Sequence, residues 1–149
     1  MGTTARFAAL GGVLIGLTGC FHQGTAGLTG DGLQPSAHQT ATTTCDSTIP
    51  TVQPITIVLD CANDDAQLLE VHWSHWGTTS ATGTANYEQN TCAPSCQSGN
   101  YTPEDPVKVT LVDPVAGAHH LRYFSIALVH FDGASPNGRT TETFPLQVP

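Results

Sequence analysis

Alternation of apolar and polar side chains predicts β-strands along most of the chain after residue 54. Leu69, Val71 and Trp73 alternate with polar residues, which is the pattern of a strand buried on one face. No window carries a helical apolar stripe. The predicted strands are residues 55–59, 69–73, 107–111, 121–131 and 141–148, with an exposed Thr/Gly/Ser-rich hairpin at 78–86. Pro145 favours an edge position for the last strand, because proline cannot donate to a ladder.

Turn-forming residues separate these strands at Asp113-Pro114, at Asp132-Gly133 and at residues 135–138. Short strands about ten residues apart are typical of sandwiches. We therefore expect an all-β fold, an antiparallel β-sandwich with immunoglobulin-like architecture. A true immunoglobulin domain is disfavoured because no tyrosine lies two residues before Cys92 or Cys96.

The N-terminal segment has the form of a bacterial lipoprotein signal. Arg6 precedes an apolar run at residues 7–17, which is the usual length of a signal core and too short to span a bilayer. Leu17-Thr18-Gly19-Cys20 then matches a lipobox, with a small residue before the cysteine. We expect a signal peptide at 1–19, lipidated Cys20 with a disordered tether at 20–44, and the β domain at 45–149. A secretory signal cut elsewhere and a buried helix are the alternatives.

Lipidation would fix the location and the first partner of the mature protein. Two or three acyl chains at Cys20 anchor stably where one does not. We expect the protein on the extracytoplasmic face of the cell membrane, held in the lipid bilayer by its N-terminal acyl chains. The low-complexity composition of residues 21–44 cannot bury enough apolar surface to offset its ordering entropy, so this segment would be a spacer.

Cysteine parity agrees with export. Of the five cysteines, lipidation removes Cys20 and leaves Cys45, Cys61, Cys92 and Cys96. Four cysteines outside the cytosol indicate two disulfides, for which three pairings are possible. A zinc site is the competing interpretation, which export and the cysteine spacing disfavour.

Charge excludes one class of partner. The formal net charge is −8, from four basic and twelve acidic residues, and the chain has no basic stripe. Nucleic-acid binding, which needs such a stripe, is therefore excluded. Anionic headgroups would repel this surface, so the acyl chains, rather than the protein surface, would anchor the protein.

Part of the predicted domain resembles a family of small secreted or lipid-anchored actinobacterial proteins, mostly uncharacterised. The resemblance lies in W-x-x-W-G from Trp73, A-x-G-x-A from Ala81, and C-x-P-x-C-x-x-G from Cys92, and extends over about residues 57–145. It implies no catalytic residues. Two positions depart from the pattern: Ala62-Asn63 where Gly-Asn is expected after the first cysteine, and Ala85 where a second glycine is usual.

Few residues are candidates for a functional site. Trp73 and Trp76 are three apart, so a regular strand would point Trp73 to the core and Trp76 outward, as a candidate binding surface. The alternative is that Trp76 packs under the loop at residues 78–90. The same offset would split His72 and His75 between the two faces. His72 and His130 could meet across strands and bind metal with His119 or His120, and Asp60, Asp64 and Asp65 could bind calcium. Neither set has a recognised ligand spacing, so we expect no metal and no cofactor.

Catalysis has no support in the sequence, because no nucleophile elbow, zinc-protease motif or phosphate loop occurs. We therefore expect a non-enzymatic binding domain at the envelope, whose partner is an envelope protein or a glycan. A structural surface lipoprotein without a specific ligand is the first alternative. A metal-binding or enzymatic envelope protein is the second.

Overall fold

The computed structural model describes residues 33, 35–36, 38–45, 47–62, 65–95 and 99–149. The expected signal peptide at residues 1–19, the expected lipidation site Cys20, and Cys96 lie outside these ranges. The strands are β1 (Thr40–Ala41), β2 (Ile57–Val58), β3 (Ala66–Trp76), β4 (Ala81–Asn90), β5 (Tyr101–Ala116), β6 (Arg122–His130) and β7 (Thr141–Pro145), with a short 3-10 helix, η1 (Ala118–His120), before β6. The expected all-β class is confirmed. No helix among the described residues has the length and hydrophobicity needed to cross a bilayer.

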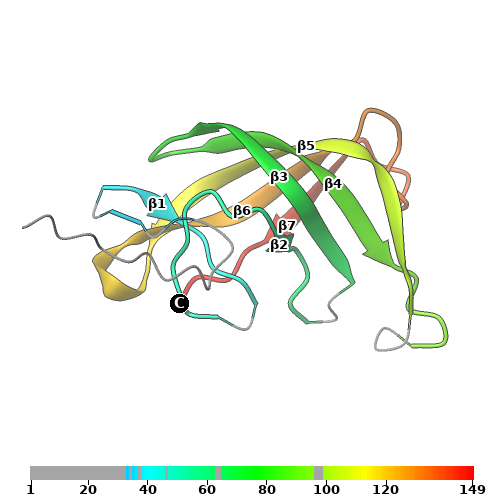
Figure 1. The fold of residues 1–149 in the computed structure, drawn as a ribbon, viewed down its shortest axis with the longest axis horizontal. Coiled ribbons are helices and arrows are strands. Elements are labelled where there is room, and N and C mark those ends of the chain that lie inside the picture. The colour runs from blue at the N-terminus through cyan, green and yellow to red at the C-terminus, as the bar shows by residue number, and fades with distance from the viewer. Residues whose placement is uncertain (1–32, 34, 37, 46, 63–64, 96–98) are drawn as a thin grey trace, which may run out of the picture.

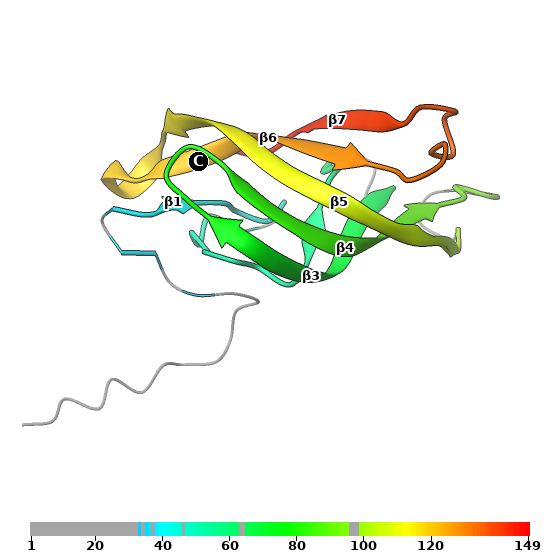
Figure 2. The ribbon, with the colours of Figure 1, turned by 90° about the horizontal axis from the view of Figure 1, so that it is seen from above.

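The strands form one curled, mixed sheet in the order β1-β6-β5-β4-β3-β2, and β7 also pairs with β6. Viewed from above, β7, β6, β5, β4 and β3 follow one another around the curl (Figure 2). Every pairing is antiparallel except that of β1 with β6. Since β7 has β6 as its one partner among the described strands, Pro145 lies at an edge, as predicted.

The alternating pattern places the core inside the curl. Val107, Val109 and Leu111 are buried along β5, and Leu68 and Tyr87 are buried on β3 and β4. The core contains two clusters of aromatic side chains. In the first, Trp73, Trp76 and Phe124 pack edge to face. In the second, Tyr87 packs on Phe131 and Phe144. Edge-to-face pairs contribute about 0.5–1.5 kcal/mol beyond burial of their area.

The turn expected at Asp113-Pro114 is absent, and β5 continues through it to Ala116. Asp113 takes a positive φ of 55°, which a short polar residue tolerates better than most. Its carboxylate and carbonyl oxygens both accept the hydroxyl of Ser125 on the neighbouring strand. The chain therefore does not reverse direction at Asp113, and the positive φ there is a local irregularity inside a continuous strand.

Two register shifts in β3 overturn the expected orientation of the tryptophans. One falls between Leu69 and His72, and the other between Trp73 and His75. Each inserts an extra residue, so that Val71, Trp73 and Trp76 all belong to the core side. The histidines correspondingly share the solvent side, because His72 and His75 are both exposed. The prediction that each pair would split between faces is therefore wrong.

The N-terminal strand ties the two sides of the curl together. Thr40 and Ala41 pair with Arg122 and Tyr123 of β6. On the other side, Trp76 Nε1 donates to the Thr40 carbonyl at 2.9 Å, and Thr40 Oγ1 donates to the Thr78 carbonyl at 2.8 Å.

Residues 40–43 are buried, so the boundary between tether and domain differs from the predicted position at residue 45. Small side chains made this segment resemble a linker. In the structure these threonines are inside the fold, and Thr43 Oγ1 donates to the Gln147 carbonyl.

Gly83 allows β4 to approach the irregular part of β3. A Cβ built there would lie 2.6 Å from the His72 carbonyl oxygen and 3.2 Å from Trp73 Cα. We predict that Gly83→Ala lowers the free energy of unfolding by about 1–3 kcal/mol, because backbone must move to admit the methyl group. Gly133→Ala is the control, since a Cβ there meets nothing within 4 Å. Urea unfolding of both variants tests this, and equal midpoints would contradict it.

Trp76 should matter for stability through its indole N–H. Trp76→Phe keeps an aromatic ring but removes the donor to Thr40, whose residue is 1% exposed. We predict a loss of about 1–3 kcal/mol, the usual cost of leaving a buried polar group unpaired. His75→Gln, on the exposed side of the same strand, should change stability by less than about 0.5 kcal/mol. Thermal unfolding measures the loss of stability in each variant. Equal losses in Trp76→Phe and His75→Gln would disprove the role of the Trp76 N–H.

Candidate functional site

A row of polar side chains crosses the outer face of the sheet. His72 pairs with Thr84, Thr84 with Lys108, and Lys108 with His130, so that four strands each contribute one residue. Directly paired residues share a face. His72, Thr84 and Lys108 are exposed, so this face is turned to solvent. Lys108 is the only lysine in the sequence.

This row lies in a shallow groove of about 370 Å³. Most of its lining surface is apolar, and hydroxyl, imidazole and ammonium groups stand among these apolar atoms: the lining residues are His72, Ser74, Thr82, Gly83, Thr84, Lys108, Val109, Thr110 and His130. We name this surface the outer groove. It can hydrogen-bond a ligand through donors and acceptors fixed on paired strands.

Internal interactions engage several polar groups of the outer groove, and Ser74 Oγ donates to the Thr82 carbonyl at 3.1 Å and lies 3.3 Å from Thr82 Oγ1. Lys108 Nζ lies 3.8 Å from Asp132 Oδ1, with both side chains more than two-thirds exposed. Exposed pairs of this kind contribute about 0–1 kcal/mol, so Lys108 can exchange this partner for a ligand at little cost. His130 Nδ1 lies 3.0 Å from Thr141 Oγ1, which orients its ring.

The histidines do not converge. His72 and His130 occupy the same row but are separated by three strand spacings, or about 14 Å. Shared coordination of zinc needs each nitrogen about 2 Å from the ion. His119 and His120 lie on η1, outside this row. Over the described ranges, no group of three or more His, Cys, Asp or Glu residues could hold a metal ion.

Calcium binding gains no support from the acidic loop either. Asp64 lies outside the described residues. Asp60 Oδ1 accepts the backbone N–H of Ala62, which closes a local turn.

One buried polar cluster was missed from sequence. Ser135 and Glu142 are 5% and 6% exposed, and Ser135 Oγ donates to Glu142 Oε1. Asn137 Nδ2 also donates to this carboxylate, at 3.1 Å. Ser135 Oγ in turn accepts the backbone N–H groups of Asn137 and Arg139. These bonds hold the β6–β7 loop, and burial closes the hydroxyl to a substrate, so we assign the cluster to structure.

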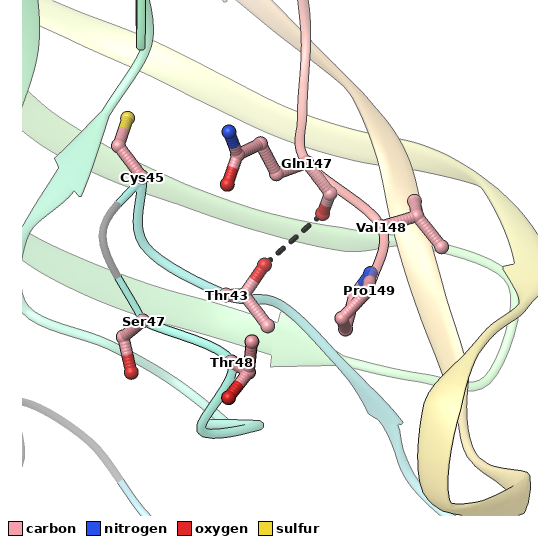
Figure 3. A pocket seen from close by; sticks show the side chains of 7 residues that line it. All are labelled: Thr43, Cys45, Ser47, Thr48, Gln147, Val148 and Pro149. Carbon is pink, nitrogen blue, oxygen red and sulfur yellow. Dashed lines mark hydrogen bonds between the residues drawn. The ribbon is translucent and has the colours of Figure 1, made fainter.

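Two further grooves lie beside the Cys45–Cys61 disulfide. The first, of about 410 Å³, runs between the segment at Thr43–Thr48 and the C-terminal residues Gln147–Pro149 (Figure 3). The Thr43–Gln147 hydrogen bond joins its two walls, and its described lining carries no charged side chain. The second, of about 480 Å³, lies between Leu59–Ala62 and Phe144–Gln147, where the two open edges of the sheet approach each other.

The disulfide joins Cys45 to Cys61, with their Cα atoms 5.1 Å apart. This pairing rules out connectivities that link either residue to Cys92 or Cys96. Cys92 is disulfide-bonded as well, to a partner outside the described residues. These three sulfurs are therefore not available as zinc ligands.

Trp76, the candidate binding residue from sequence, is engaged inside the molecule. Its ring contacts Trp73 and Phe124, and its N–H is bonded to Thr40. The structure instead presents the outer groove, whose residues come from four strands and were not recognisable as a set. Comparison of the chain with protein-family models, with curated proteins and with solved structures gives no match.

Proposed function

We propose that the chain is a lipoprotein anchored on the extracytoplasmic face of the cell membrane, whose β domain binds an envelope glycan or protein. The lipobox at residues 17–20 supports the anchor. The Cys45–Cys61 disulfide supports an oxidising compartment, because such bonds are rare in the cytosol. The family resemblance and the immunoglobulin-like sandwich remain part of this proposal.

The outer groove carries the binding part of the proposal. It is an open surface on paired strands, and it is lined by Thr84 and Thr110 beside Lys108. Such a surface suits a hydrogen-bonding, extended partner better than an enclosed small molecule. Binding surfaces on rigid elements also hold their geometry better than surfaces on loops.

A structural lipoprotein without a specific ligand is the second candidate. The packing of both tryptophans favours it, because their N–H groups bond to the carbonyls of Pro54 and Thr40 rather than facing solvent. An exposed aromatic platform for a sugar ring is thereby lost at Trp76. The presence or absence of a ligand at the outer groove separates the two functions.

Anchoring can be tested by substituting the lipobox cysteine. We predict that Cys20→Ala moves the protein from the membrane fraction to the soluble fraction, because no thiol remains to carry the acyl chains. Thr18→Ala keeps Gly19 and the thiol and should stay in the membrane. Intact-mass measurement of the extracted wild type should give a chain starting at Cys20 with a lipid increment. A mature protein lacking lipid would refute the proposal.

The outer groove can be tested with insoluble cell-wall glycan as the probe. We predict that the lipid-free wild type co-sediments with it and that Thr84→Arg with Thr110→Arg weakens retention about tenfold or more, because long side chains fill the groove. Thr48→Arg with Thr79→Arg adds the same two charges at exposed threonines outside the outer groove and should bind normally. Equal retention of all three proteins would exclude the outer groove, and no retention of wild type would favour a protein partner or the structural alternative.

A further inference from the structure

The exposed large apolar side chains of the described residues lie in the N-terminal part of the described chain. Among the described residues, the exposed large hydrophobic side chains are Leu33, Ile49 and Ile55, at 62%, 54% and 58%. All three belong to the segment from residue 33 to residue 59, which we name the N-terminal lobe. A single exposed leucine or isoleucine is ordinary on a protein surface. Here the three large apolar side chains that are exposed among the described residues all lie between residues 33 and 55.

Acidic residues, in contrast to the exposed apolar ones, are concentrated after the N-terminal lobe. The sequence of the N-terminal lobe contains one acidic residue, Asp46, and no lysine or arginine. Ten of the twelve acidic residues lie at positions 60–149. An anionic leaflet therefore repels the sheet region and leaves the lobe nearly unaffected. This asymmetry turns the apolar lobe, rather than the acidic sheet, toward a membrane.

The lobe and the outer groove are on opposite sides of the sheet. Trp73 and Trp76 point into the curl and bond to Pro54 and Thr40 of the lobe. His72, on the same strand, points outward into the outer groove. In Figure 1, β3, β4 and β5 arch over the N-terminal lobe. A membrane contact by the lobe would leave the outer groove facing away from the bilayer.

We propose that the N-terminal lobe contacts the lipid surface directly through Leu33, Ile49 and Ile55, as a second attachment beside the acyl chains. This inference rests on the proposed anchoring. Only thirteen peptide steps separate Cys20 from Leu33, so even a fully extended chain spans at most about 47 Å. Tethering at this range gives an effective concentration of the order of millimolar, at which a weak apolar contact is populated.

The occupant is lipid rather than a second copy of the chain. A second mature copy would bring a net charge of −9, since Arg6 leaves with the predicted signal peptide, and the acidic sheet regions of the two copies would repel each other. Lipid is already at hand at the anchor, and the acyl–headgroup boundary accepts apolar side chains with few charges around them.

The test compares amide hydrogen exchange of the lipidated full chain with and without vesicles of phosphatidylcholine and phosphatidylglycerol. We expect vesicles to slow exchange at residues 47–56. Leu33→Ser with Ile49→Ser and Ile55→Ser should remain vesicle-bound through Cys20 but lose this protection. Their exposed positions make the variant compatible with folding. Thr143→Ser, at an exposed position of β7 outside both the N-terminal lobe and the outer groove, is the control and should keep the protection.

The outcomes separate the two proposals. A chain that stays on vesicles with unchanged exchange at 47–56 overturns the lobe contact and leaves anchoring intact. A chain that carries no lipid and does not stay on vesicles overturns anchoring and, with it, the lobe contact. Protection that appears without vesicles and rises with protein concentration assigns the apolar residues to a contact between copies, which also overturns the lipid proposal.

Discussion

Hydrogen bonding of Thr40 to both sides of the curled sheet, through its backbone and its side chain, is the constraint on which the curled form of this domain depends. Its strand is part of the β6 ladder, while its carbonyl and hydroxyl bond to Trp76 and Thr78 at the end of β3. A curled sheet with this end unpaired would expose backbone groups and the Trp73–Trp76–Phe124 cluster. The small, threonine-rich segment that covers this end is therefore as important to the core as the apolar strands are.

Most of the strands could be predicted from alternation, because one buried face imposes a period of two on residues such as Val107, Val109 and Leu111. The N-terminal boundary of the domain could not be predicted in this way. Thr40–Thr43 look like linker because their composition is polar, and their burial depends on carbonyls of Thr78 and Gln147, which are distant in sequence. Composition reports how much apolar surface a segment can bury, and it does not report hydrogen-bonding partners supplied by other strands.

The outer groove was hidden for a related reason. His72, Lys108 and His130 are 36 and 22 residues apart, and only the register of three ladders aligns them. Shifts within β3 also turned His75 and Trp76 to the faces opposite to those that strict alternation assigns. A shift of one residue reverses every later side chain, so side assignments from sequence fail beyond a bulge. The Cys45–Cys61 pairing likewise needed three dimensions, since parity alone allows several connectivities.

The pairing of β1 with β6 also has a consequence for the order of folding. The first strand finds its ladder partner about eighty residues later in the chain, and Thr43 bonds to Gln147 near the very end. Contacts of such high sequence separation form late and slowly, because loop closure must precede them. An emerging chain therefore cannot complete this fold until residues as far as Gln147 are available. Until β6 has emerged, Thr40 and Ala41 have no ladder partner, so the segment that covers the tryptophan end of the core is among the last parts to be fixed in place.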